Sequence, residues 1–222
     1  MLTSVNWPMN LNLKIPLVLA AGLLMITTRA MAYEEVEDLV DVFASDRQFV
    51  AVADGRSTFS EARRSSEKIL WQGAKGEVGA FLTSDRLLAV SVRSGQWNTR
   101  DLKINEKKGL PEMLISAHLV IMLTGERIVG FGTHTGGFIQ TRMPIGESVV
   151  DKAAEGRVAV VITPSRAFGF SSYRRGIAEV RFRREEAMVS LKTTYNLIRM
   201  RTTQRLITLK SEDAVWRLFD LK

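Results

Sequence analysis

The side chains able to do chemistry in this chain of 222 residues are few and far apart. The chain has two histidines, His118 and His134, whose separation is not that of a metal site, and it has no cysteine. No Gly-x-Ser-x-Gly stretch occurs, and the serines have no obvious histidine general base. The sequence therefore predicts neither a metal nor a cofactor, and a protein that is not an enzyme.

The paired carboxylates and the glycine-rich stretch are likewise weak evidence for a catalytic or phosphate-binding site. The acid pairs, at 34–35, 185–186 and 212–213, are adjacent in sequence, whereas a glycosidase needs two carboxylates facing each other across a cleft. The stretch GTHTGG (132–137) lacks the lysine and the helix of a phosphate loop. We interpret it as a turn between strands, whose backbone N–H groups could contact a ligand.

Basic side chains gather between residues 173 and 186. Strand alternation would place Arg181 and Arg183 on one face, where guanidinium forks could grip a phosphate, sulfate or carboxylate. The alternative is an exposed outer strand whose arginines keep its edge unpaired. The weak candidates for ligand binding are Tyr173, Arg174, Arg175, Arg181, Arg183 and Arg184.

The N-terminus has the pattern of an export signal. Lys14 precedes an uncharged run from Ile15 to Thr28, and Ala30-Met31-Ala32 is a small-x-small cleavage site. A membrane span needs about 20 apolar residues, more than this run offers, so we expect residues 1–32 to be cleaved and the mature chain to carry no stable span. Retention as an anchor is the alternative, and translation from Met1 or from Met9 fits equally. The predicted location is periplasmic or secreted.

The charge of the mature chain bounds its partners. Loss of Lys14 and Arg29 with the signal lowers the formal net charge from +7 to +5. This mild excess fits an acidic protein, an anionic glycan or a lipid headgroup of the envelope, and we expect no nucleic acid. Without disulfides, packing and hydrogen bonds must hold the exported fold together.

A repeat organises the rest of the chain. Five arginines recur at a nearly constant period of about 39 residues, and a threonine stands three places before each of the last four, with Ala44 in the first copy. Apolar residues at alternate positions on both sides predict two half-buried strands joined by a tight turn. We expect these side chains to be structural, although a ring of arginines could also form an anion site at one mouth of a channel. The set is Arg47, Arg86, Arg127, Arg166, Arg205, Thr83, Thr124, Thr163 and Thr202.

Two further strands complete each unit. Four short strands in about 39 residues are typical of a β-propeller blade, whereas a β-sandwich gives no reason for this period and a β-helix repeats at half of it or less. We therefore predict an all-β protein: one five-bladed β-propeller domain over 33–222, with four-stranded units near 38–75, 76–117, 118–154, 155–194 and 195–222. The last unit ends after its third strand, so we expect residues 33–37 to dock beside 214–221 and close it.

The unit resembles that of the WD-repeat-like β-propeller superfamily. Its third strands end in Arg100-Asp101-Leu102 and Phe219-Asp220-Leu221, close to the Trp-Asp step of that family, although the Gly-His pair is missing. The resemblance spans residues 38 to 221 and implies the fold only, because the superfamily hosts enzymes, lectins and scaffolds alike.

The resulting functional hypothesis is an exported, monomeric, non-enzymatic scaffold that binds a protein or an envelope component. The alternative is a lectin-like binder of an anionic glycan or lipid headgroup that uses the recurring aromatics Trp97, Phe138 and Trp216. An extracellular hydrolase or lyase is the third and least favoured hypothesis.

Overall fold

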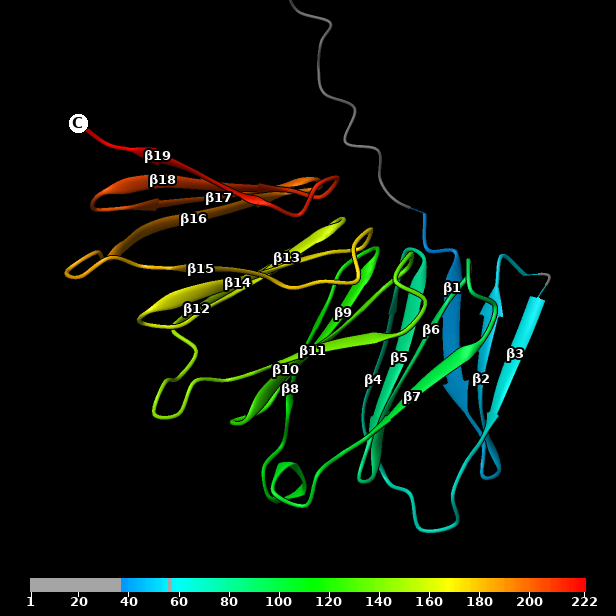
Figure 1. Cartoon of the computed structure of the whole chain (residues 1–222). Helices are drawn as coiled ribbons and strands as arrows, with labels where there is room; N and C mark the ends of the chain where they lie inside the picture. The colour runs from blue at the N-terminus through cyan, green and yellow to red at the C-terminus, as the bar shows by residue number, and fades with distance from the viewer. Residues whose placement is uncertain (1–36, 56) are drawn as a thin grey trace, which may run out of the picture. The chain divides into compact units, whose positions relative to one another are not determined.

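The computed structural model describes residues 37–55 and 57–222. The expected signal peptide, its cleavage site and the segment Tyr33 to Val36 lie outside the described residues, so the expectations that rest on them stay predictions. Within the described residues the chain forms five antiparallel sheets and one short 3-10 helix, η1 (Glu106–Lys108) (Figure 1).

The sheets follow one another along the chain. The first contains β1 (Val40–Ala44), β2 (Gln48–Ala53) and β3 (Ser57–Ala62). The second contains β4 (Ile69–Lys75), β5 (Val78–Thr83), β6 (Arg86–Ser91) and β7 (Trp97–Asp101), and the third β8 (Glu112–Ile115), β9 (Leu119–Leu123), β10 (Arg127–Gly132) and β11 (Phe138–Arg142). The fourth contains β12 (Asp151–Glu155), β13 (Val158–Ile162), β14 (Arg166–Ser171) and β15 (Ala178–Arg181), and the fifth β16 (Met188–Thr194), β17 (Leu197–Thr202), β18 (Arg205–Lys210) and β19 (Trp216–Asp220). Each strand pairs with the next one along the chain within its sheet, so the predicted all-β fold of repeated antiparallel units is confirmed.

The boundaries of the units differ from the prediction by one strand. We expected the strands near 69–74, 111–117, 148–154 and 187–194 to end the preceding unit, but each pairs with the strand that follows it, as in Gln72 opposite Phe81. The physical reason lies in the connections. Tight turns at Gly76 and Gly156, whose φ values are +55° and +50°, join these strands to the next ones, whereas longer linkers separate them from the previous sheet.

This shift changes the expected closure of the fold. The fifth sheet already has four strands, and β19 is its last, so the prediction that this unit lacks a strand was wrong. The sheet with three described strands is the first one. The reason for docking residues 33–37 beside 214–221 therefore disappears.

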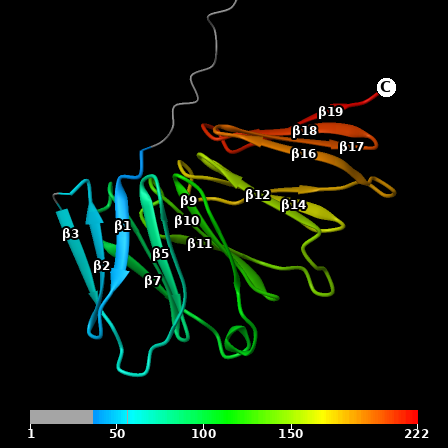
Figure 2. The ribbon, with the colours of Figure 1, turned by 180° about the vertical axis from the view of Figure 1, so that it is seen from behind.

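Apolar layers join each sheet to its neighbour in sequence. The first strands of successive sheets lie side by side, β4 with β8, β8 with β12 and β12 with β16. Figure 2 shows the sheets from behind in the same order. Buried side chains from the two sheets interlock, for example Ile121 with Phe170 in the layer between the third and fourth sheets. Strands such as β9 and β13 are buried along their whole length because both of their faces are covered.

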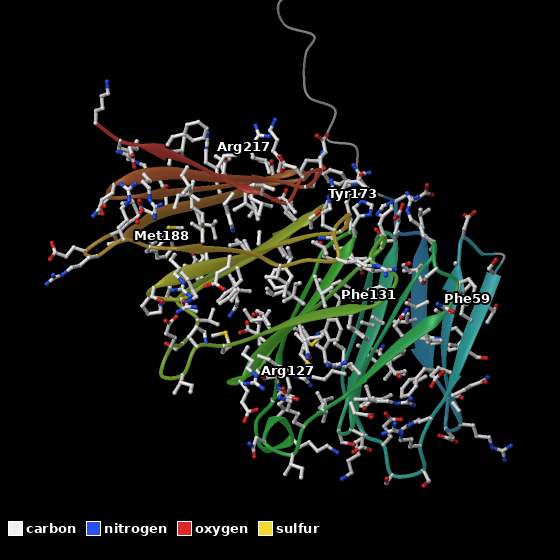
Figure 3. The ribbon with its side chains drawn as sticks, viewed as in Figure 1. Phe59, Arg127, Phe131, Tyr173, Met188 and Arg217 are labelled. Atoms are coloured by element: carbon white, nitrogen blue, oxygen red, sulfur yellow. The ribbon has the colours of Figure 1, made fainter. Side chains whose placement is uncertain are left out.

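The connections give the sheets two chemically different ends. The linker end carries the Thr-x-x-Arg turns between second and third strands and the linkers from one sheet to the next. The tyrosine end carries the turns after the first and third strands of the four-stranded sheets, at 76–77, 92–96, 116–118, 133–137, 156–157, 172–177, 195–196 and 211–215. Figure 3 shows Arg127 at the linker end and Tyr173 at the tyrosine end.

Candidate functional site

Turns of four successive sheets place a group of polar and aromatic side chains at the tyrosine end. The second sheet contributes an acid and an arginine, the third two histidines, the fourth an arginine and a tyrosine, and the fifth a tyrosine. We call this group the tyrosine-end cluster: Glu77, Arg93, His118, His134, Arg157, Tyr173 and Tyr195.

A buried histidine links three of the sheets. Nδ1 of His118 lies 3.2 Å from a carboxylate oxygen of Glu77, and its Nε2 contacts the hydroxyl of Tyr195. Because a carboxylate only accepts hydrogen bonds, Nδ1 of His118 carries the hydrogen and Nε2 accepts one from the tyrosine. Burial lowers the pKa of His118, and the charge of Arg157 lowers it further, while Glu77 acts in the opposite direction. His118 is therefore neutral near pH 7 and fixes the orientation of Tyr195.

The carboxylate of Glu77 is held in its charged form by the same group. Arg93 donates from Nε and Nη2 at 2.9 and 3.0 Å to its two oxygens. Burial acts to raise the pKa of Glu77, but the hydrogen bonds from Arg93 and the interaction with His118 outweigh it and lower that pKa. The negative charge that Glu77 brings to the cluster is thus already committed to two partners.

Arg157 is held by aromatic rings. Its guanidinium carbon lies 5.3 Å from the ring centre of Tyr173 and 4.9 Å from that of Tyr195. The ring of Tyr173 also packs against His134, with the ring centres 4.6 Å apart. Among the residues that the structure describes, no acid forms an ion pair with Arg157 and its buried Nε has no hydrogen-bond partner.

The linker end is organised by a different and repeated network. Arg86 donates from Nε to Glu67 at 2.8 Å, Thr83 donates to the same carboxylate at 2.8 Å, and Nη2 of Arg86 reaches the carbonyl of Ala62 in the preceding sheet at 2.6 Å. The same contacts recur around Arg127 with Glu106 and the carbonyl of Asp101, and around Arg205 with Glu186 and the carbonyl of Arg181. These arginines thus join adjacent sheets and lie among structural contacts.

Two copies of the motif depart from this pattern. Arg166 is half-buried and contacts Glu147 at 3.7 Å and Glu179 at 2.9 Å, with Thr163 bonded to the turn backbone. In the first sheet the turn is shifted by one residue from the predicted register. Ser45 donates to the carbonyl of Gln48 at 3.2 Å, as Thr83 donates to that of Arg86, so the prediction that the exposed Arg47 is the first copy was wrong. The network is therefore strongest in the second, third and fifth sheets.

The sequence interpretation missed the acids of this network. Glu67, Glu106, Glu147 and Glu186 each stand at nearly the same distance in sequence before the arginine of their unit, a signal that was available in the repeat. Burial acts to raise the pKa of Glu186, but hydrogen bonds from Arg205, the Arg183 N–H and Thr202 lower it to about 2. The pKa values of Glu67 and Glu106 are also lowered, for the same reason.

The basic segment 173–186 is divided between the two ends. Tyr173, Arg174 and Arg175 belong to the turn after β14 at the tyrosine end, whereas Arg183 and Arg184 follow β15 at the linker end. The prediction that Arg181 and Arg183 share a strand face was wrong, because β15 ends at Arg181. Arg183 contacts Asp220 at 2.8 Å, and the 95% exposed side chain of Arg184 lies near Glu185. Of the six candidates, only Tyr173 enters the tyrosine-end cluster.

The recurring aromatics lie between the sheets. The indole N–H of Trp97 donates to the carbonyl of Phe59 at 3.1 Å, and that of Trp216 donates to the carbonyl of Ala178 at 3.0 Å. Phe138 packs against Phe131, with ring centres 5.5 Å apart. These contacts are those of interior packing, so the lectin-like alternative does not find its expected aromatic platform here.

A signal for the tyrosine-end cluster was present in the repeat register. The position after each first strand carries Glu77, His118, Arg157 and Asn196, which follow one another at the period of the repeat. The position after each third strand carries Arg93, His134, Tyr173 and Glu212 at the same period. One register of the repeat thus holds a constant arginine, and these two hold a different chemical group in each copy.

Two other features are absent from the described part of the chain. There, no group of three His, Asp or Glu side chains is placed to hold a metal ion. Among the same residues, no helix has the length and apolar character needed to cross a membrane.

Comparison with known proteins gives a distant likeness only. No family model matches the chain, and no curated protein matches it. It is similar to Hsv2 from Kluyveromyces lactis, with 10% identity, a TM-score of 0.36 and coverage of 84% of this chain and 74% of that one. It is also similar to Prp20p from Saccharomyces cerevisiae, with 9% identity, a TM-score of 0.37 and coverage of 78% of this chain and 58% of that one. A likeness at this level of identity and TM-score carries no argument about family or function.

Proposed function

We propose that this protein is an exported, non-enzymatic β-propeller scaffold that binds a protein or another envelope component through its tyrosine end. The observation that carries the proposal is the contrast within the repeat. The register that holds the sheets together keeps its arginine, whereas the registers that form the tyrosine end vary from copy to copy. A surface that recognises a partner needs a different group at each place, while a structural joint needs the same group each time.

The composition of the tyrosine end supports binding. Its half-exposed side chains include Tyr173, Tyr195 and Arg157, and the side chain of Arg93 is 49% exposed. Tyrosine and arginine are enriched in protein interfaces because they bring a large contact area together with hydrogen-bond donors. The cluster also draws on four sheets, so a partner that contacts it spans several repeats.

The backbone beneath the cluster supports a rigid recognition surface. Hydrogen bonds cross from sheet to sheet at this end, from the N–H of Glu77 to the Ala117 carbonyl at 2.8 Å and from the N–H of Arg157 to the Tyr195 carbonyl at 2.7 Å. Side chains that are already held in place lose less freedom when a partner binds. The surface is therefore already ordered before a partner binds.

The test of this function is site-specific photo-crosslinking in the cells that make the protein. A photoreactive phenylalanine analogue at Tyr173 is compared with the same analogue at Leu110, which is 73% exposed in the linker after β7. We expect a discrete cross-linked species from position 173 and none from position 110, with both variants melting like the parent. Equal patterns from the two positions, or none from position 173, would contradict the assignment of the binding surface. Identification of the cross-linked species separates a protein from a glycan or lipid.

Export is proposed from residues 1–32 and has its own test. N-terminal sequencing of the protein recovered outside the cytoplasm is expected to begin at Tyr33. Recovery of a chain that retains the hydrophobic run, in the membrane fraction, would make the protein a membrane-anchored one.

A further inference from the structure

Arg157 differs from the arginines that stabilise this fold. Arg86, Arg127 and Arg205 each meet a buried glutamate and a carbonyl of the preceding sheet. Arg157 instead lies against Tyr173 and Tyr195, and within the described residues its buried Nε has no partner. The arginines that join adjacent sheets are therefore each paired with a carboxylate. Among the described residues, Arg157 meets two tyrosine rings and forms no ion pair with an acid.

A second buried donor lies beside Arg157 without a partner. The backbone N–H of Ser172 donates to the carbonyl of Arg157 at 3.0 Å, which brings the two residues together between neighbouring strands. The hydroxyl of Ser172 is also buried and, within residues 37–55 and 57–222, has no hydrogen-bond partner. Unpaired buried polar atoms are rare in proteins, and two in neighbouring residues indicate a place where a polar group is expected.

The electrostatics around Arg157 favour a negative group. Glu77, the acid of the cluster, is already bound by Arg93 and His118. Burial lowers the pKa of His134, and the charges of Arg93 and Arg157 lower it further, with Glu77 acting against them. Burial lowers the pKa of His118 as well, so neither imidazole adds a positive charge near neutral pH. Arg93 is paired with Glu77, and the charge of Arg157 remains to attract an anion.

We propose that Arg157 binds an oxyanion, either a carboxylate or a phosphate, carried by the ligand of the tyrosine end. The guanidinium carbon of Arg157 lies over the rings of Tyr173 and Tyr195, and two guanidinium N–H groups can make a forked contact with two oxygens of a carboxylate or phosphate. The Ser172 hydroxyl is the nearby neutral donor, and Arg93 and His134 belong to the same cluster. This inference rests on the proposed function for the place of binding and adds the chemical group that is recognised.

Small anions test this inference without any partner molecule. The purified protein is titrated with inorganic phosphate and, separately, with acetate, while NMR follows the ring signals and the pKa of His134. We expect saturable binding that raises the pKa of His134, because a bound anion offsets the charges of Arg93 and Arg157. The two titrations show whether tetrahedral phosphate or planar carboxylate is preferred. No saturable change at His134 with either anion would overturn the proposal.

Matched variants assign the anion to Arg157. Arg157→Gln should weaken binding by about 10- to 100-fold, as expected for loss of a charged hydrogen bond. Arg184→Gln removes the same charge from a 95% exposed side chain at the linker end and should change affinity by less than about twofold. Arg157→Lys keeps the charge without the planar fork and should bind with intermediate affinity. Equal losses in Arg157→Gln and Arg184→Gln would show a general charge effect and overturn the site.

Two further observations keep the result decisive. Urea unfolding of each variant shows whether a lost signal reflects lost structure, and if Arg157→Gln unfolds, the titration of the parent protein and of Arg157→Lys still decides the question. Cross-linking from position 173 without anion binding would remove this inference and leave the proposed function. Anion binding without cross-linking would keep the anion site at Arg157 and contradict the proposed function.

Discussion

The two ends of the sheets use the same residue types for different purposes. At the linker end, arginine, threonine and glutamate form closed networks, and the side chains of Glu67, Glu106 and Glu186 are fully buried. At the tyrosine end, arginine, histidine and tyrosine are half-exposed or exposed over a buried histidine, and one arginine has aromatic rings in place of a carboxylate. Buried and paired charges are typical of contacts that hold two sheets together. An arginine near the surface without a paired acid is available to a binding partner.

The repeat explains how one chain produces both ends. In the second, third and fifth sheets the Thr-x-x-Arg turn sits in the same environment between two sheets, so the same side chains satisfy the same carbonyl and carboxylate. The turns of the tyrosine end are joined through their backbones, as from the N–H of Glu77 and of Arg157 to the neighbouring sheet, and their side chains are therefore able to differ. The proposed binding surface accordingly lies where the copies differ.

The largest expected effect comes from removing one of the buried arginines that join adjacent sheets. Arg205→Ala leaves the buried carboxylate of Glu186 without its cation and should lower the free energy of unfolding by about 3–5 kcal/mol. Urea denaturation measures this value. Arg47→Ala, which removes an exposed arginine from the corresponding turn of the first sheet, is the matched control and should change stability by less than about 0.5 kcal/mol. If the two variants lose the same stability, or if Arg205→Ala weakens cross-linking from position 173 while remaining folded, the separation of the two ends fails.

The second-largest expected effect is a loss of stability at low pH, which acts on the linker end. The pKa of Glu186 is lowered from 4.5 to about 2 in the folded state, so the unfolded chain takes up the proton first as the pH falls. The stabilisation is complete above pH 4.5 and is lost as the pH falls through about 2, which amounts to roughly 3 kcal/mol from this group. Urea denaturation at several pH values measures the loss. In Glu186→Gln, whose total stability is lower, the slope between these pH values should decrease. An unchanged slope would mean that Glu186 does not carry the effect.

The smallest effect concerns the histidine of the tyrosine end. The pKa of His118 lies below its ordinary 6.5, because of burial, so the unfolded chain binds the extra proton and stability declines as the pH falls below 6.5. Glu77→Gln removes the negative charge that favours the imidazolium ion and should lower the pKa of His118 further. NMR titration of the ring protons of His118 in the parent protein and in the variant measures both values. A higher pKa in Glu77→Gln would show that the assigned hydrogen bond between these residues is wrong.

The sequence by itself determined the period, the strand character and the structural turn. These features are local, since alternation of apolar residues and the Thr-x-x-Arg spacing act over a few neighbours along the chain. Even the joining of adjacent sheets through arginine was accessible, because the residue recurs at one register. The glutamates that pair with these arginines were missed because they lie in the linkers, well before the arginine in sequence. No alternation of apolar residues marks their positions there.

Only the tertiary structure decided which strands share a sheet and which side chains meet. A strand with a turn on one side and a linker on the other can pair in either direction, and the tight turns at Gly76 and Gly156 settled the choice. His118 and Tyr195 are 77 residues apart, and Arg157 meets Tyr195 from a neighbouring sheet. Such contacts depend on how successive sheets pack face against face, and this packing brings turns of different repeats to one place regardless of their distance along the chain.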